Sequence, residues 1–162
     1  MGHEEVYVLN GGLQEWVRQG FETIKEQKLE VARGNFKAQL NPDFIISKKE
    51  VEENLKSQKA QVIDARSTLR FNGEAPEPRA GLRSGHIPDS NNLHYANILE
   101  DGKYKSEEQL QSLFSEVTPN NQPLIFTCGS GITACILYLA ADALLANNLS
   151  VYDGSWTEWG ST

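Results

Sequence analysis

Cys128 stands where an apolar segment meets a run of small residues. The apolar segment is Pro123–Cys128, and the chain continues with Gly129, Ser130 and Gly131 before a long helix-like stretch. In a parallel sheet, functional groups gather at the carboxyl ends of strands, just before the next helix. Small residues at such a point can curve so that their backbone N–H groups converge on an anion. A thiolate at Cys128 fits this cradle, which predicts a nucleophilic cysteine.

The residues around Cys128 narrow the reactions that such a nucleophile could perform. Protein tyrosine phosphatases use a similar loop with an arginine at the sixth position after the cysteine, where this chain has Ala134. Without that arginine, phosphoryl transfer loses its main electrostatic clamp. A serine-hydrolase elbow would need a glycine two residues before Ser130, and that residue is Cys128. A cysteine protease would need a histidine base, and His86 lies in the sequence GHIP, which is typical of a turn entering a strand.

Short apolar segments alternate with amphipathic ones along the chain, which predicts an α/β fold with a doubly wound, mainly parallel sheet flanked by helices. The predicted strands are Gln61–Arg66, Asn91–Ala96, Pro123–Cys128 and Leu149–Gly154. The predicted helices are Ser47–Ser57, Ser106–Val117 and Thr133–Asn148. The first two helices open with serine followed three residues later by Glu50 or Gln109, which is the capping-box pattern. The third is apolar on nearly all sides, which predicts burial against the sheet.

A long segment rich in arginine, proline and glycine runs from Arg66 to Asn92. A loop of this length inside a domain is usually functional or disordered, and its four arginines favour a functional role. Arg66 is expected to form a structural ion pair with a buried carboxylate. We expect Asp64 to end its strand and anchor the loop, and His86 to fix the turn before Asn92. Neither of these two is expected to take part in the chemistry.

Charge and cysteine content exclude several classes of function. A net charge of −7 argues against non-specific nucleic-acid binding, which depends on Lys and Arg neutralising phosphates. No apolar run approaches the roughly 18 residues of a membrane span, and the first residues show no signal-peptide pattern. Cys128 and Cys135 are too far apart on one helix for a disulfide, and the histidines show no metal-ligand spacing with them. We expect a cytoplasmic protein without metal, cofactor, nucleic-acid partner or membrane association.

The sequence CGSGITA, residues 128–134, closely resembles the active-site loop of the 3-mercaptopyruvate sulfurtransferases of the rhodanese superfamily. The resemblance continues in three further segments, which are Asp64–Arg66, Arg70–Asn92 and Tyr152–Gly160. It covers nearly all of residues 44–160 and implies a rhodanese-like fold. It also implies that Cys128 takes sulfur from 3-mercaptopyruvate as a persulfide and that pyruvate leaves. A thiol acceptor such as thioredoxin, or cyanide, would then remove the sulfur.

The resemblance assigns roles to the arginine segment and to the loop. Arg70 and Arg79 would hold the carboxylate and keto oxygen of the substrate, and a planar guanidinium suits a bidentate grip on an α-keto carboxylate. The alternative for each arginine is a surface salt bridge near Glu74 or Glu77. Ser130 would hydrogen-bond the departing enolate or relay a proton, or is present only because it is small. Arg83 has no family counterpart and is expected to form only a surface salt bridge. The other expected substrate-binding residues are Gly129, Gly131, Ile132 and Thr133.

Three other functions stay open at this point. A thiosulfate:cyanide sulfurtransferase would have the same fold and a different sulfur donor. Family members that prefer thiosulfate have basic residues directly after the cysteine, whereas Gly129 and Ser130 are neutral, which favours 3-mercaptopyruvate. A rhodanese module could instead carry a persulfide between proteins or bind a partner. A phosphatase-like or arsenate-reducing enzyme is disfavoured by the missing arginine.

An internal similarity indicates a tandem arrangement. Val6–Trp16 resembles Leu149–Trp159, because each reads as a strand, an Asx-Gly turn and a short helix with Glu-Trp. A chance match is the alternative. We interpret residues 1–20 as the remnant of a first rhodanese domain, 21–43 as an interdomain linker and 44–162 as the catalytic domain. In full-length family members the first domain packs over the active site, so turnover by this chain alone is expected to be low.

Overall fold

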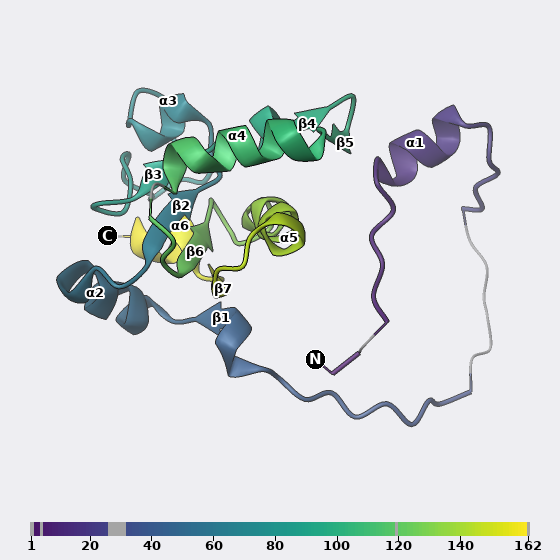
Figure 1. The fold of residues 1–162 in the computed structure, drawn as a ribbon, viewed down its shortest axis with the longest axis horizontal. Helices are drawn as coiled ribbons and strands as arrows, with labels where there is room; N and C mark the ends of the chain where they lie inside the picture. Colours follow the sequence, from purple (N-terminus) through teal and green to yellow (C-terminus); the bar gives the residue numbers. More distant parts are fainter. Residues whose placement is uncertain (1, 4, 26–31, 119, 162) are drawn as a thin grey trace.

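A parallel sheet organises the part of the chain that the structure describes, and five strands belong to it (Figure 1). The computed structural model describes residues 2–3, 5–25, 32–118 and 120–161. In spatial order the strands are β1 (Ile45–Ile46), β7 (Leu149–Tyr152), β6 (Leu124–Thr127), β2 (Gln61–Asp64) and β3 (Asn91–Asn92). All neighbouring pairs are parallel, with Val62 opposite Ile125 at the centre. The central strand β6 therefore ends immediately before Cys128.

Helices cover both faces of this sheet, which confirms the predicted α/β architecture. The helices are α2 (Lys48–Ser57), α3 (Thr68–Phe71), α4 (Glu107–Val117), α5 (Ala134–Leu144) and α6 (Ser155–Trp159), besides α1 (Gly12–Arg18) outside the sheet. Leu124 and Phe126 of β6 pack in a cluster with α4 and α5, whereas Ile125 packs with α2 and α6. This alternation follows from the period of two along a strand, and it buries β6 on both sides.

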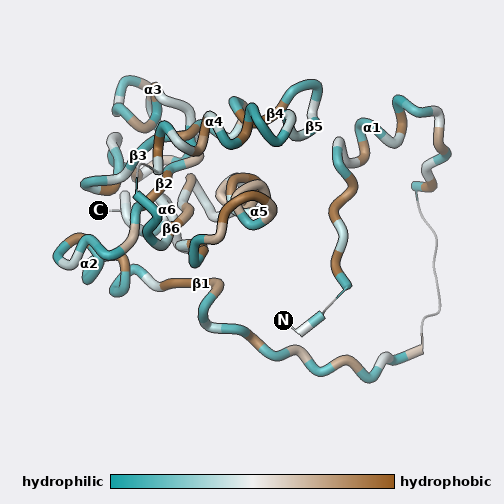
Figure 2. The backbone as a smooth tube through the Cα atoms, viewed as in Figure 1, coloured by the Kyte–Doolittle hydropathy of each residue, from teal (hydrophilic) through white to brown (hydrophobic). Residues whose placement is uncertain are grey.

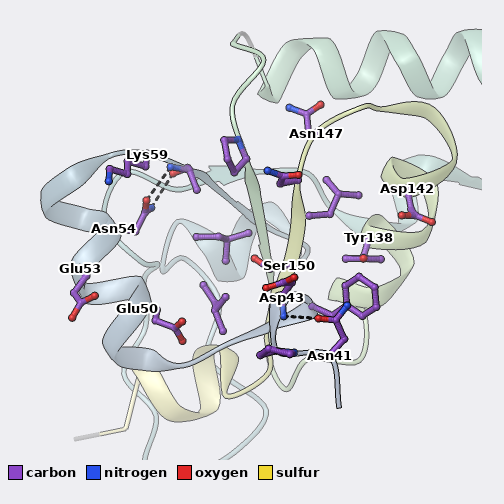
Figure 3. A pocket seen from close by; sticks show the side chains of 18 of the residues that line it. Asn41, Asp43, Glu50, Glu53, Asn54, Lys59, Tyr138, Asp142, Asn147 and Ser150 are labelled. Atoms are coloured by element: carbon purple, nitrogen blue, oxygen red, sulfur yellow. Dashed lines mark hydrogen bonds between the residues drawn. The ribbon is translucent and has the colours of Figure 1, made fainter. Parts of the chain in front are cut away.

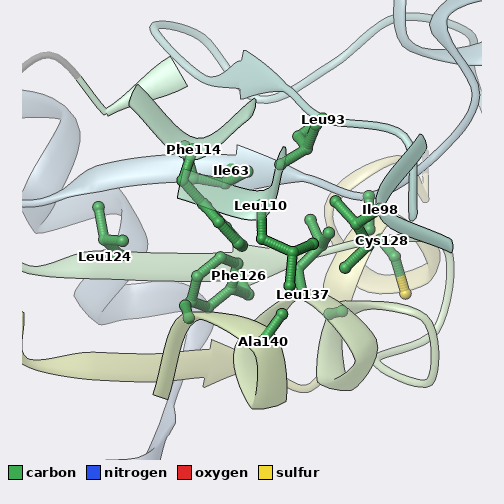
Figure 4. Packing of buried hydrophobic residues seen from close by; sticks show 13 residues of the cluster. Ile63, Leu93, Ile98, Leu110, Phe114, Leu124, Phe126, Cys128, Leu137 and Ala140 are labelled. Carbon is green, nitrogen blue, oxygen red and sulfur yellow. The ribbon is translucent and has the colours of Figure 1, made fainter. Parts of the chain in front are cut away.

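The larger hydrophobic cluster supports the end of β6. Phe114, Phe126 and Leu137 are fully buried in it, and each such side chain contributes about 1.5–3 kcal/mol by leaving water. Figure 4 shows Cys128 at the edge of this cluster, beyond Ile98 and Leu137. The backbone of Cys128 is thereby held on a rigid base, as a nucleophile requires.

The predicted helices form, with one change of length. Ser47 and Ser106 cap α2 and α4, and both capping boxes are complete. The helix expected to reach Asn148 ends at Leu144, because Leu145 is extended and the Asn147 amide donates to the carbonyl oxygen of Gln122 instead. Only one face of α5 is fully buried, so the predicted burial holds for that face alone.

The strand expected over Asn91–Ala96 is shorter than predicted. β3 ends at Asn92, although the amide of Leu93 still donates to the carbonyl oxygen of Asp64, the last residue of β2, and the amide of Tyr95 to that of Ala65. The chain then turns through the 3₁₀ helix η2 (Tyr95–Ile98) into a hairpin that the sequence did not indicate. Its antiparallel strands are β4 (Leu99–Glu100) and β5 (Lys103–Tyr104).

The N-terminal segment lies beside this hairpin and away from the sheet (Figure 1). The Nζ of Lys103 lies 2.8 Å from Glu15, and the amide of Tyr104 donates to the Oδ1 of Asn10. The strand expected before Asn10 does not form within the described residues, because residues 5–9 have no neighbouring strand to pair with. Tyr7 is 88% exposed and Val6 is 70% exposed, so these side chains stay in solvent. The backbone tube in Figure 2 is brown over parts of the stretch between the N-terminus and α1.

Residues 32–41 have no regular secondary structure and lead to the 3₁₀ helix η1 (Pro42–Phe44). The side chain of Asn41 caps it by accepting from the amide of Asp43. Among the described residues, no helix has the length and apolar character needed to cross a lipid bilayer.

Candidate active site

Cys128 begins the loop between β6 and α5, at the carboxyl edge of the sheet. Only 2% of the residue is exposed. Its carbonyl oxygen accepts from the amide of Trp156 at 2.9 Å, and its own amide donates to the Oγ of Ser155 at 3.2 Å. Both partners belong to α6. The backbone around the thiol is therefore fixed by an element that follows it by more than 25 residues.

The side chain of Ser155 hydrogen-bonds to two backbone amides of the loop at Cys128, a role that the sequence did not indicate. Its hydroxyl oxygen accepts from the amides of Cys128 and Gly131 and donates to the carbonyl oxygen of Tyr152 at 2.8 Å. The residue is fully buried and has φ 48°, a left-handed conformation that is uncommon for serine. Strain is retained where the surroundings enforce it, which points to a functional position. The motif YDGSWTEWG contained the signal, but its serine could not be separated from its neighbours by pattern alone.

The loop leaves several backbone donors free. Across the described part of the chain, the N–H groups of Gly129, Ser130, Ile132 and Thr133 find no protein acceptor. Unpaired amides at the start of a helix attract an anion. The loop therefore has the donors that the sequence predicted for a thiolate or persulfide cradle.

Gly131 has a different place from the one expected. It does not line the cavity at Cys128, because its amide is used by Ser155. Its φ of +80° suits glycine, and a Cβ there would lie 3.0 Å from the Oδ1 of Asp153. Gly131 therefore allows the loop to approach the β7–α6 turn, and substrate contact by this residue is not indicated.

A cavity of about 320 Å³ opens over Cys128. Its lining brings together Arg70, Arg79, Cys128, Gly129, Ser130, Ile132 and Thr133, all expected from the sequence, with Glu77, Pro78, Leu82 and Thr157. Ile132 is 74% exposed at the rim. Two guanidinium groups and a cysteine on one cavity suit a small anionic substrate with an electrophilic sulfur.

The first arginine of the cavity belongs to a buried ionic network. Arg70 donates from Nη2 to the Oε2 of Glu77 at 2.6 Å, and Arg66 donates to the Oε1 of the same carboxylate at 2.8 Å. Arg66 also pairs with Asp64, with neither side chain more than 1% exposed. The expected structural role of Arg66 is confirmed.

The second arginine of the cavity is linked to the loop through a threonine. Arg79 donates from Nη1 to the Oγ1 of Thr157 at 2.8 Å, and that hydroxyl donates to the carbonyl oxygen of Gly129 at 2.6 Å. The amide of Thr157 donates to the same oxygen. α6 thus positions both the loop and one arginine.

Neither histidine of this region is placed as a base for Cys128. His86 stacks on Phe71 with ring centroids 4.0 Å apart, and its Nδ1 lies 2.8 Å from the Phe71 carbonyl oxygen. The pKa of His94 lies below its usual value because of burial and the charge of Arg70. Neither His86 nor His94 lines the cavity.

Cys135 is a free thiol on α5, as Cys128 is at its strand end. Its Sγ lies 3.3 Å from the carbonyl oxygen of Gly131. The pKa of Cys135 is raised by partial burial and then by the charges of Cys128 and Asp153. Within the described ranges, no three His, Cys, Asp or Glu side chains are grouped as metal ligands.

A larger cavity, of about 920 Å³, lies at the opposite end of the strands (Figure 3). Its lining includes Pro123, the residue before β6, and Leu149, the first residue of β7. Its labelled polar side chains include Asp43, Glu50 and Glu53, with no cysteine, histidine or arginine in the lining. Size alone therefore does not identify the candidate site. The smaller cavity combines a cysteine with two arginines, whereas the larger one has Lys59 as its cation among the described residues.

Comparison with known proteins relates this site to a family of enzymes. A family model described as "Rhodanese-like domain" matches residues 47–162. A human protein named 3-mercaptopyruvate sulfurtransferase is 42% identical over 98% of this chain, and a rat thiosulfate sulfurtransferase is 43% identical over 98%. The chain spans about half the length of the curated relatives it matches, 54% in both cases. The crystal structure of the Escherichia coli 3-mercaptopyruvate sulfotransferase SseA matches with TM-score 0.79 and 35% identity, covering 94% of this chain and 57% of that one.

Proposed function

The chain belongs to the rhodanese-like domain family, and we propose that it is a sulfurtransferase that takes sulfur from 3-mercaptopyruvate as a persulfide on Cys128. The observation that carries the proposal is one cavity that joins Cys128 to two arginines and to a loop of unpaired amides. Its relatives include proteins named for this activity.

In the first half-reaction, Arg70 and Arg79 bind the carboxylate and keto oxygen of the donor. The Cys128 thiolate attacks the donor sulfur, and the carbon–sulfur bond breaks with its electron pair moving into an enolate. The enolate takes up the proton that the donor thiol loses and leaves as pyruvate, so the persulfide left on Cys128 is an anion. Ser130 donates a hydrogen bond to the enolate oxygen or relays that proton. Preorganised guanidinium groups stabilise the developing negative charge without reorganising.

The persulfide then occupies the loop between the half-reactions. Its terminal sulfur is an anion, and the amides of Gly129, Ser130, Ile132 and Thr133 are the donors available to it. A thiol acceptor such as thioredoxin, or cyanide, attacks the outer sulfur and regenerates the Cys128 thiolate. Neither step needs a cofactor.

Thiosulfate is the second candidate donor, because relatives named thiosulfate sulfurtransferase match at similar identity. Gly129 and Ser130 are neutral residues beside the cysteine. A dianion of this size gains most from positive charge directly at the sulfur acceptor, so the neutral loop supports 3-mercaptopyruvate. A persulfide carrier that lacks turnover with free donors is the remaining alternative.

We place residues 1–20 as the end of a first rhodanese domain, 21–43 as a linker and 44–162 as the catalytic domain. Exposed apolar side chains in residues 6–9 support this placement, because they would pair and pack within such a domain. We also propose a cytoplasmic location, since a free Cys128 and Cys135 suit a reducing compartment.

Intact-protein mass spectrometry tests the proposed function directly. Reduced protein is incubated with 3-mercaptopyruvate or thiosulfate, and the same is done with Cys128→Ser and, as a matched control, Cys135→Ser. We expect one added sulfur atom with 3-mercaptopyruvate in the parent chain and in Cys135→Ser, removed by a reductant and absent from Cys128→Ser. An adduct with thiosulfate alone would assign that donor, and uptake by Cys128→Ser would refute the assignment of the nucleophile.

A further inference from the structure

Glu77 lines the cavity over Cys128, and neither half-reaction of the proposed sulfur transfer uses it. Its carboxylate is 1% exposed, although it faces a site for anions. A buried carboxylate is costly unless it is paired and hydrogen-bonded. Glu77 meets this requirement entirely with two arginines, accepting from Arg66 on Oε1 and from Arg70 on both oxygens.

The contact with Arg70 has a definite geometry. The Nη2 of Arg70 donates to Oε2 at 2.6 Å, and its Nε donates to Oε1 at 3.3 Å. A two-point contact of this kind fixes the plane of a guanidinium as well as its position. Within the described residues, the Nη1 of Arg70 has no protein acceptor, and the Arg70 side chain is 26% exposed. One edge of the guanidinium is therefore held, and the other is free.

The carboxylate of Glu77 is also held by Arg66, a second arginine. Arg66 donates to Glu77 while it is fixed by Asp64, by the carbonyl oxygen of Gly85 at 2.8 Å and by the face of Trp156 at 4.4 Å. Arg66 is fully buried, so these contacts leave it little freedom. The direction of Arg70 is thus set by a rigid network that starts at the end of β2.

We infer that Glu77 is a positioning residue, which orients Arg70 so that its free edge grips the carboxylate of an α-keto acid. This inference rests on the proposed function for its substrate class. A simple charge argument predicts the opposite effect of Glu77, since a carboxylate in the cavity repels an anionic donor. Removing the charge would then tighten binding, whereas loss of orientation would weaken it. The two roles are distinguished by the sign of the change.

Glu77→Gln provides this test, because it keeps the shape and removes the charge. The binding readout uses pyruvate, an unreactive α-keto carboxylate, and measures the concentration that halves the rate of Cys128 alkylation by iodoacetamide. The sulfur readout measures persulfide formation in a single turnover against 3-mercaptopyruvate concentration. We expect about a tenfold or larger increase in both half-saturating concentrations in Glu77→Gln, the effect of losing one charge-assisted contact. The limiting rate should change less.

Glu74→Gln is the matched control, because it removes a carboxylate from the same segment; among the described residues that carboxylate accepts from the side-chain amide of Asn72 and contacts neither Arg66 nor Arg70. Its half-saturating concentrations should stay within about twofold of the parent values if Glu77 acts by orientation. Glu77→Asp, which keeps the charge but shortens the reach, should also raise them, and it replaces Glu77→Gln if circular dichroism shows that variant unfolded.

The outcomes separate the inference from the proposed function. Unchanged or tighter pyruvate protection in the Glu77 variants would overturn the inference, as would absence of protection in the parent chain. An equal increase in Glu74→Gln would also overturn it, because the effect would then follow from the loss of any carboxylate in this segment. If the parent chain is protected by pyruvate but gains no sulfur, the proposed function fails while the orientation of Arg70 by Glu77 is still decided.

Discussion

Ser155→Ala is expected to destabilise the protein and to disorder the loop that begins at Cys128. The Ser155 hydroxyl takes part in three hydrogen bonds, with the amides of Cys128 and Gly131 and with the carbonyl oxygen of Tyr152. Ser155 is fully buried, so water cannot replace these contacts without rearrangement. Alanine would leave two amides and one carbonyl oxygen without partners.

The expected loss of stability in Ser155→Ala follows from the three hydrogen bonds that the variant lacks. An unsatisfied buried group costs about 1–3 kcal/mol, and partial relaxation of the loop recovers some of this cost. We expect the free energy of unfolding to fall by about 2–5 kcal/mol and Tm to fall by roughly 5–15 °C for a domain of this size. Ser155→Gly should lose the same bonds, yet be more stable than Ser155→Ala by about 1 kcal/mol, because glycine adopts the φ of 48° without strain.

Urea unfolding followed by circular dichroism measures the stability change, and persulfide formation measures the state of the loop. Ser130→Ala is the control, since the Ser130 side chain makes no hydrogen bond to any described residue and should change stability by less than about 0.5 kcal/mol. Sulfur uptake by Ser155→Ala should be slower than in the parent chain at a temperature where both are folded. A stability loss below about 1 kcal/mol, or a variant Ser155→Gly less stable than Ser155→Ala, would refute this account of the loop.

Three other measurements address the surroundings of the thiol. Cys135→Ser should take up sulfur at the parent rate, since partial burial and the charges of Cys128 and Asp153 raise the pKa of Cys135; a lost mass adduct would contradict this. Gly131→Ala should slow uptake about tenfold or more in the same assay, because φ is +80° and the new Cβ would meet Asp153, and a parent-like rate would show that the loop adapts. Stability should decline above pH 10, because burial and a carboxylate hydrogen bond raise the pKa of Tyr152. The unfolded tyrosine ionises first, so the contribution is complete below pH 10 and is lost above it. Tyr152→Phe should flatten this alkaline decline of the urea midpoint, and an unaltered decline would argue against it.

The position of Cys128 at a strand end could be predicted from the sequence because local rules determine it. An apolar run before Cys128 predicted a central strand, and small residues after it predicted a loop at the carboxyl edge. The serine capping boxes placed two helix starts to the residue. Hydrophobic periodicity and helix capping depend on residues that are neighbours in the sequence, so strands and helix starts can be predicted from the sequence alone.

The parts that were missed depend on contacts between distant segments. The long arginine segment contains no regular pattern beyond the short α3, and its direction is set by Glu77 and Arg66, whose pairing is a tertiary contact. Gly131 was expected at the substrate, but its amide is used by Ser155, which follows it by 24 residues. The strand expected before Asn10 failed for a similar reason, because a strand needs a partner and none is present among the described residues.

The last helix has a larger part in the site than its length suggests. Three consecutive residues, Ser155, Trp156 and Thr157, all hydrogen-bond to the loop that begins at Cys128, through backbone and side-chain groups alike. Thr157 also accepts from Arg79, so one turn of helix holds both the loop at Cys128 and the Arg79 guanidinium. Ser155 contributes its buried hydroxyl from a strained backbone conformation, and Trp156 and Thr157 contribute their backbone amides. The conformation of the backbone at Cys128 therefore depends as much on α6 as on the loop itself, and changes in α6 should alter sulfur uptake even where they leave the cysteine loop untouched.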